Sequence, residues 1–181
     1  MTQSTTATPP APPTADELDV ARLVEYMARP HAELRARVLE LLATEAFQID
    51  PELDRAEHRQ RTLESLQIVA DEGLGLVGFP EEFGGQADPA GAVAVFETLA
   101  FGDISTVIKF GVQFGLWGGS LYQLGTAAHH ERWLGAMGRM ELPGCFAMTE
   151  IGHGSNVRGI ETTATFDPET DELVVHTPHE D

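Results

Sequence analysis

The chain changes character at one short stretch, residues 144–159, with the sequence GCFAMTEIGHGSNVRG. Hydrophobic residues before this stretch recur at helical spacing, whereas those after it alternate with the two-residue period of β-strands. Pro143 and Gly144 mark the boundary, because neither residue type favours the continuation of a helix. The sequence therefore predicts an α+β protein in which an all-α bundle precedes the strands.

The boundary stretch combines an apolar run with a polar loop. Phe146, Ala147 and Met148 predict a short buried strand. The loop after it holds glycines, which permit positive φ and a close approach of backbone N–H groups to a ligand, and side chains that can hydrogen-bond to one. These residues are Thr149, Gly152, Gly154, Ser155, Asn156 and Gly159. On the residues alone the loop is either a ligand site or a tight turn at a domain border, and the turn is the commoner outcome.

Residues 14–142 carry the helical periodicity and are predicted to form the bundle. Thr14 and Glu17 predict a capping box for the first helix, and Asp88 and Pro89 predict the cap and first residue of the fourth. The segment 76–85 is too apolar for a free loop and is expected to lie against the core. The expected helices cover residues 14–28, 31–47, 55–72, 89–101, 104–124 and 126–140.

The segment 104–124 is the most apolar part of the chain and, at about twenty residues, is long enough to raise the question of a membrane span. Lys109, Gln113 and Gln123 interrupt it, and no basic flank sets a topology, so a buried helix of the bundle is the better prediction. Glycines recur along it every fourth residue and predict a bare face for close packing of another backbone: Gly111, Gly115 and Gly119.

Residues 143–181 predict strands joined by a turn. Residues 160–166 alternate between apolar and polar, residues 167–172 supply a turn, and residues 173–176 return as the next strand. With the strand expected before the loop, three strands would have bare edges.

Charge and composition exclude several classes of function. The formal net charge of −18 argues against nucleic acid and anionic membrane surfaces, because phosphate binding needs clustered Lys and Arg. The single cysteine, Cys145, precludes an internal disulfide and is predicted to be a buried small hydrophobe. His130 and Glu131 begin like a zinc-protease motif, but position 134 is Leu, so no metal site is predicted. Residues 1–13 lack a basic residue and an apolar core, so they predict a disordered tail rather than a targeting signal.

Two segments carry a resemblance to a known family. Residues 147–159, AMTEIGHGSNVRG, resemble the flavin-binding signature of the acyl-CoA dehydrogenase and acyl-CoA oxidase superfamily. Residues 78–85, GFPEEFGG, resemble the Pro-Glu-Glu-aromatic-Gly-Gly loop of that family's helical domain. His153 and Asn156 depart from the dehydrogenase pattern and resemble the oxidase branch. The resemblance implies a helical domain at 14–142 and the truncated start of an antiparallel β-barrel domain at 143–181.

The resemblance implies an FAD-dependent enzyme that performs α,β-dehydrogenation of a fatty acyl-CoA in fatty acid β-oxidation, with oxygen or an electron-transfer flavoprotein as the electron acceptor. Phe146, Met148 and Thr149 would lie along the isoalloxazine ring of FAD. Gly154 and Ser155 would contact FAD, and Ser155 would also contact the substrate.

The resemblance also implies that the chain supplies no catalytic residue. In the family a glutamate of a C-terminal helical domain removes the α-proton; no residue here corresponds to it, and Glu150 is expected to be structural. We therefore expect an N-terminal portion, inactive alone, of an enzyme that is a homo-oligomer at full length. A cytoplasmic location is the default, because a peroxisomal address would lie at a C-terminal end. The alternative is a non-catalytic helical association module derived from the same fold.

Overall fold

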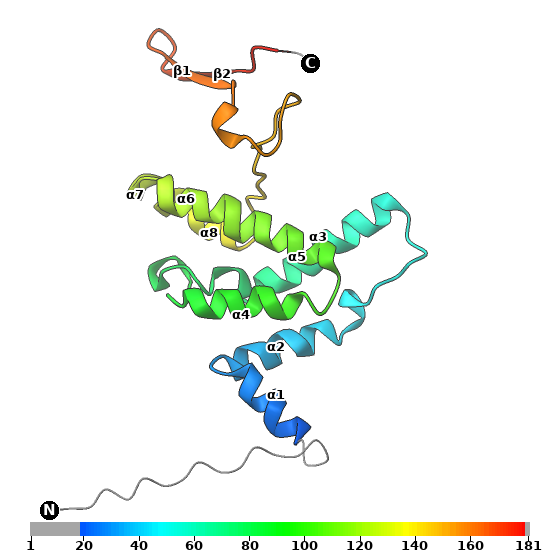
Figure 1. Cartoon of the computed structure of the whole chain (residues 1–181). Helices are drawn as coiled ribbons and strands as arrows, with labels where there is room; N and C mark the ends of the chain where they lie inside the picture. The colour runs from blue at the N-terminus through cyan, green and yellow to red at the C-terminus, as the bar shows by residue number, and fades with distance from the viewer. Residues whose placement is uncertain (1–18, 180–181) are drawn as a thin grey trace, which may run out of the picture.

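A computed structural model describes residues 19–179 (Figure 1). The expected tail at 1–13 and the expected capping box of Thr14 and Glu17 lie outside these residues. The helices stack in layers from α1 and α2 at one end to the long α5–α6 helix at the other, and the hairpin of β1 and β2 stands apart beyond them. The order of helices followed by strands confirms the α+β class.

In the first half of the bundle the third helix follows its predicted boundaries closely, whereas the first helix begins at Val20 instead of residue 14 and the second ends at Leu42 instead of Phe47. Asp19 caps the first helix by accepting a hydrogen bond from the Arg22 amide at 3.0 Å. Asp54 and Glu57 form a reciprocal capping box at the start of α3, which explains why that helix begins at Arg55. The elements are α1 (Val20–Ala28), α2 (Ala32–Leu42), the 3₁₀ turn η2 (Glu45–Phe47) and α3 (Arg55–Asp71).

The segment 76–85 lies against the core, as predicted. Gly73, at φ +70°, ends α3, and the 3₁₀ turns η3 (Leu74–Leu76) and η4 (Glu81–Phe83) follow. Leu76, Val77 and Phe79 are buried. Asp88 then caps α4 (Pro89–Leu99) by accepting from the Gly91 amide at 2.9 Å.

The apolar segment 104–124 forms one continuous helix, made of α5 (Ile104–Phe110), the π-helical segment η5 (Gly111–Trp117) and α6 (Gly118–Leu124). The expected close packing along its glycines holds only at Gly111, where a Cβ would lie 3.1 Å from Phe96 Cε2, and is wrong at Gly115 and Gly119, where a Cβ would meet nothing within 4 Å. A π-helical turn contains one more residue than an α-helical turn. Glycines four residues apart therefore no longer lie on the same face of the helix. Gly118 makes the close contact instead, because a Cβ there would lie 2.7 Å from Met137 Cε.

The last helix runs from α7 (Ala127–His129) through the π-helical segment η6 (His130–Leu134) to α8 (Gly135–Gly138). The Thr126 amide donates to His129 Nδ1 at 3.1 Å, and the His129 ring stacks on Trp133 with centroids 5.1 Å apart. No helix in the range 19–179 is long and apolar enough to cross a membrane.

The core joins all of the larger helices. Val38 of α2, Leu66 of α3 and Val95 of α4 are fully buried, and they pack in one cluster with residues of the last two helices. The buried apolar side chains of those two helices in this cluster are Val107, Phe110, Phe114, Leu121, Leu134 and Met137.

The strand expected at Phe146–Met148 does not form within the described residues. The chain from 143 to 149 has no regular structure, and Phe146 and Met148 are each 38% exposed. A strand needs a hydrogen-bonded neighbour, and none of residues 19–179 pairs with this segment. Cys145 is exposed, so its expected burial is also wrong.

The two later strands form as predicted. After the 3₁₀ turn η7 (Val157–Gly159), β1 (Thr163–Asp167) pairs antiparallel with β2 (Glu172–His176). Ala164 lies opposite Val175, and Phe166 lies opposite Leu173. These four side chains share one face, since successive strand residues point to opposite sides.

We predict that Leu66→Ala will lower the free energy of unfolding by about 3 kcal/mol, because it removes a fully buried side chain and leaves a cavity in the core. Urea denaturation followed by circular dichroism measures the change. Leu124→Ala is the matched control, since Leu124 is 84% exposed, and it should change stability by less than about 0.5 kcal/mol. Equal effects of the two substitutions would contradict the assignment of the core.

Candidate functional site

The polar loop at residues 149–159 folds back on itself through a pair of backbone hydrogen bonds between Glu150 and His153. The Glu150 amide donates to the His153 carbonyl at 3.2 Å, and the His153 amide donates to the Glu150 carbonyl at 3.1 Å. Gly152 lies inside this turn, where a Cβ would meet nothing within 4 Å. The turn is therefore open to solvent at Gly152.

The Glu150 carboxylate fastens the two ends of the loop together. Its Oε1 accepts from the Thr162 amide at 2.8 Å and from the Thr162 hydroxyl at 2.6 Å. Its Oε2 accepts from the Glu161 amide at 2.9 Å. Both oxygens are thus engaged, and the side chain is only 14% exposed.

These hydrogen bonds favour the charged form of the carboxyl group. The Thr162 hydroxyl, the amides of Glu161 and Thr162, and the nearby His153 together lower the pKa of Glu150 to about 2. A carboxylate with so low a pKa is a weak base at neutral pH. The structure therefore gives Glu150 the structural role that the sequence suggested.

His153 closes the same loop from inside. Its Nε2 lies 2.9 Å from the Gly159 carbonyl oxygen and 3.2 Å from Glu150 Oε2. Both partners are acceptors, so Nε2 carries the proton. His153 thereby ties the middle of the loop to η7 and to the Glu150 carboxylate.

A concavity of about 830 Å³ opens between this loop and the hairpin. Met148 and Thr149 of the predicted site line it, and Val175 comes from the hairpin. Its volume is in the range of small-molecule and cofactor sites. The rest of its wall is formed by Ala147, Glu150, Ile151, Gly152, His153, Ile160, Glu161, Thr162, Thr177 and His179.

The other three predicted site residues, Phe146, Gly154 and Ser155, are not part of its wall. Gly154 lies beside Thr149, because a Cβ on Gly154 would be 3.8 Å from Thr149 Cγ2. Ser155 is exposed, and so is Phe146. The structure therefore brings Met148, Thr149 and Gly154 together and leaves Phe146 and Ser155 on the outer surface.

Sequence reasoning missed the contribution of the segment after the loop. Ile160 and Thr162 line the concavity together with Val175 and Thr177. The alternating pattern after residue 160 shows that such side chains exist, but only the antiparallel pairing of β1 with β2 brings residues 175–177 to the same place.

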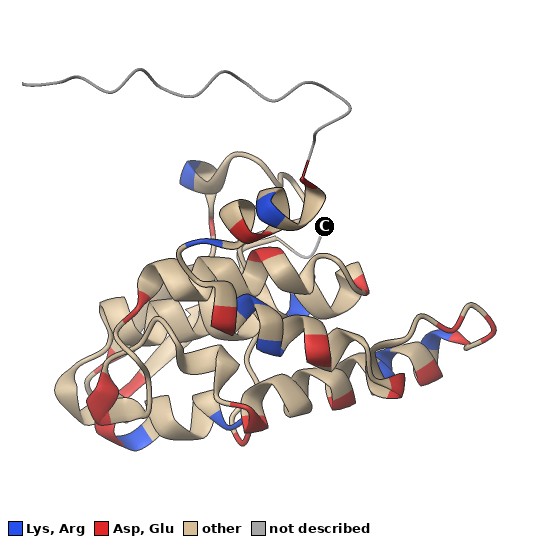
Figure 2. Ribbon diagram, turned by 90° about the horizontal axis from the view of Figure 1, so that it is seen from below, with Lys and Arg blue, Asp and Glu red and all other residues tan. Residues whose placement is uncertain are grey.

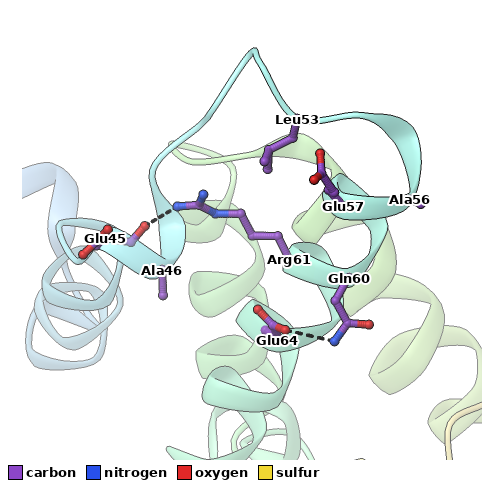
Figure 3. Close-up of a pocket in the computed structure, with 8 residues that line it drawn as sticks. All are labelled: Glu45, Ala46, Leu53, Ala56, Glu57, Gln60, Arg61 and Glu64. Atoms are coloured by element: carbon purple, nitrogen blue, oxygen red, sulfur yellow. Dashed lines mark hydrogen bonds between the residues drawn. The ribbon is translucent and has the colours of Figure 1, made fainter.

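A second concavity, of about 680 Å³, lies between η2 and α3 (Figure 3). Arg61 crosses it and donates to the Glu45 carbonyl oxygen at 2.6 Å. Glu45, Glu57 and Glu64 surround it, so an anionic cofactor would be repelled there. Acidic residues are also distributed over many other elements, interspersed with basic ones (Figure 2).

The paired histidines have packing roles. His130 lies edge-on to Phe83, with ring centroids 5.8 Å apart, and close to Tyr122 at 5.6 Å. Within residues 19–179, no three side chains of His, Cys, Asp or Glu are grouped so that they could hold a metal ion.

Comparison with known proteins identifies the chain's relatives. Peroxisomal acyl-coenzyme A oxidase 2 of Arabidopsis thaliana is 35% identical over 157 residues, which are 86% of this chain and 22% of that protein. The chain therefore spans about a fifth of the length of the curated relatives it matches.

Solved structures show the same fold. An acyl-CoA oxidase from Yarrowia lipolytica has a TM-score of 0.66 and 26% identity, covering 83% of this chain and 21% of that one. An acyl-CoA dehydrogenase from Bacillus anthracis, solved with FAD, has a TM-score of 0.68 and 23% identity, covering 81% and 25%. The family model for the acyl-CoA dehydrogenase N-terminal domain matches residues 29–141. The chain thus belongs to the acyl-CoA dehydrogenase family and contains its N-terminal domain, with acyl-CoA oxidases among its relatives.

Proposed function

We propose that the chain supplies the helical domain and the flavin-contacting loop of an FAD-dependent acyl-CoA oxidase, which performs α,β-dehydrogenation of a fatty acyl-CoA in fatty acid β-oxidation. The observation that carries this proposal is the concavity beside Met148 and Thr149, held open by the Glu150 carboxylate. The identity to an acyl-coenzyme A oxidase supports the oxidase branch.

The residues present suit a flavin. An isoalloxazine ring has flat apolar faces and a polar edge, and the exposed side chains of Phe146 and Met148 offer apolar surface of this kind. The Thr149 hydroxyl makes no hydrogen bond to the described part of the chain, and neither do the amides of Gly154 and Ser155. Donors are therefore free where an anionic cofactor and a thioester would need them.

Each of these residues has a separate task in the proposal. Phe146 and Met148 contact the ring, and the Thr149 hydroxyl or amide hydrogen-bonds to its polar edge. The Gly154 and Ser155 amides hold FAD, and Ser155 also orients the pantetheine side of the substrate. FAD, when bound, would accept the hydride from the substrate β-carbon.

Glu150 does not serve as the base for the α-proton in this proposal. Glu150 is the nearest carboxylate in the sequence, but both of its oxygens accept hydrogen bonds and its pKa is about 2. It therefore holds the loop and does not take a proton at neutral pH. A cytoplasmic location and a homo-oligomeric full-length enzyme remain predictions.

We predict that titration of FAD with the purified chain will shift the flavin absorbance band, and that Thr149→Val will raise Kd about fivefold to tenfold. One hydrogen bond to the flavin edge is lost, and the side-chain volume is kept. Thr165→Val is the control, because Thr165 lies in β1 outside the concavity. An unperturbed band at saturating chain concentration would favour the association module over the flavin site.

The chain alone should not oxidise a fatty acyl-CoA. The expected reason is that the resemblance assigns the base to a glutamate of a C-terminal helical domain and that Glu150 is engaged in hydrogen bonds, so substrate can be held without losing its proton. Incubation of the FAD-loaded chain with a fatty acyl-CoA under air, with enoyl-CoA measured by chromatography, checks this. Steady formation of enoyl-CoA would contradict it.

A further prediction concerns pH. Because the folded state lowers the pKa of Glu150 from 4.5 to about 2, its contribution to loop stability is complete above pH 4.5 and is lost as pH falls toward 2. The amide proton shifts of Glu161 and Thr162 in NMR spectra should therefore titrate with a midpoint near 2. Glu150→Gln should abolish this transition, whereas Glu169→Gln in the hairpin turn should leave it unchanged. A midpoint near 4.5 would show that the hydrogen bonds are absent.

A further inference from the structure

A buried glutamine joins the helical bundle to the segment that enters the proposed site. Gln113 of η5 is 0% exposed. Its Nε2 donates to the carbonyl oxygens of Met137 and Leu142, both at 3.1 Å. Its Oε1 accepts from the Gly144 amide at 2.9 Å.

The orientation of this side-chain amide is fixed by its partners. Two carbonyl oxygens face one end of the amide and one N–H faces the other, so exchange of its nitrogen and oxygen would bring oxygen against oxygen. Both Nε2 hydrogens and one Oε1 lone pair are used. Removal of the amide would leave the Leu142 carbonyl and the Gly144 N–H without this partner in a partly buried place, whereas the Met137 carbonyl still accepts from the Met140 amide at 3.2 Å.

The three partners follow one another along the exit from the bundle. Met137 belongs to α8, Leu142 ends the turn after that helix, and Gly144 begins the extended segment. The turn is already closed locally, because the Glu141 and Leu142 amides both donate to the Ala136 carbonyl, at 2.9 and 3.1 Å. Gln113 adds the attachment between this turn and a helix far away in the sequence.

The Trp117 ring packs closely against Gly144, at the start of the same segment. A Cβ placed on Gly144 would overlap atoms of the Trp117 indole ring, so only glycine permits this close approach of backbone to ring. Trp117 lies in η5 together with Gln113. We call Gln113, Trp117 and Gly144 the junction clamp.

Two residues of the junction clamp, Gln113 and Trp117, lie in the π-helical segment η5. The Gly118 amide donates to the Gln113 carbonyl, five residues earlier, which is a π-type hydrogen bond. This hydrogen bond closes a turn of η5 that runs from Gln113 to Gly118 and includes Trp117. π-Helical segments within α-helices are rare and are frequent at functional sites.

We propose that Gln113 is a positioning residue of the flavin site: through the junction clamp it sets the direction in which Phe146, Met148 and Thr149 leave the bundle. The distance along the chain from Gly144 to Thr149 is short, and the segment between them has no strand partner among the residues described here. The direction of this segment is therefore fixed at its first residue, by Gln113 and Trp117. This inference rests on the proposed function.

The test compares two substitutions that each remove a buried polar side chain. Gln113→Met keeps the length of the side chain and removes its hydrogen bonds. Ser65→Ala is the matched control, because the Ser65 hydroxyl is 3% exposed and donates to the Ala46 carbonyl at 2.9 Å, in a part of the bundle outside the clamp. The 181-residue chain is used throughout.

Three quantities are measured for each variant: the urea midpoint, hydrogen exchange at the Gly144 amide, and the Kd and band shape of FAD. Gln113→Met should speed exchange at Gly144 about tenfold, since that amide loses its acceptor. It should also raise Kd for FAD about tenfold and alter the flavin band. Ser65→Ala should shift the urea midpoint but leave Gly144 exchange and FAD binding unchanged.

Gly144→Ala is the second variant, in case Gln113→Met does not fold. It leaves every helix of the bundle intact and pushes the extended segment away from Trp117, so FAD binding should weaken while the urea midpoint is nearly kept.

The outcomes separate the two claims. If the unchanged chain does not perturb the flavin band, the proposed function is wrong, and so is the proposed role of Gln113 in FAD binding. Hydrogen exchange at the Gly144 amide still shows, independently of FAD, whether the junction clamp holds the segment. If the unchanged chain binds FAD, but Gln113→Met and Gly144→Ala bind it as tightly as Ser65→Ala does, the positioning role is wrong and Gln113 serves only the core.

Discussion

The hydrogen bonds of one buried amide, that of Gln113, connect the two structurally different parts of this chain. The bundle is held by apolar packing, which is insensitive to direction. The segment leaving it has neither a strand partner nor a buried side chain between 143 and 149 in the described structure. Hydrogen bonds are directional, so a fully buried amide with three backbone partners can set a direction that hydrophobic contacts cannot.

Directional hydrogen bonds also determine the shape of the loop at the proposed site. The Glu150 carboxylate holds both ends of the loop through the amides of Glu161 and Thr162, and His153 holds its middle through the Gly159 carbonyl. Because these polar groups satisfy one another, the exposed residues Thr149, Gly154 and Ser155 keep amides and a hydroxyl that have no partner among the described residues. The loop therefore has an internal hydrogen-bonded frame and an external row of donors.

Local signals in the sequence predicted most of the bundle. Asp88 and Pro89 placed the start of α4 correctly, and the apolar spacing of residues 104–124 gave the long helix, because caps and periodicity act within a few residues. The predictions that failed depended on distant partners. The burial of Phe146 and Cys145 needs a neighbouring strand, and the packing of Gly115 needs an uninterrupted α-helix.

The candidate site shows the same limit. The signature at 147–159 pointed to Met148, Thr149 and Gly154, which the structure brings together. It gave no sign of Val175, which reaches the concavity only through the register of the hairpin. Nor could Gln113 be recognised, since an apolar helix interrupted by a glutamine looks the same whether the glutamine is exposed or joined to a backbone amide 31 residues later.

The net charge explains why such a site would rely on backbone donors. FAD and CoA are both anionic, and a chain with 29 acidic and 11 basic residues repels them at long range. Attraction must then come from groups that act only at contact. Amide N–H groups and a threonine hydroxyl meet this requirement, because their dipoles are strong at hydrogen-bond distance and vanish beyond it. The binding energy from such groups therefore depends more on their orientation than the binding energy from a charged side chain does. A rigid attachment of the segment at Gly144 would help to keep that orientation.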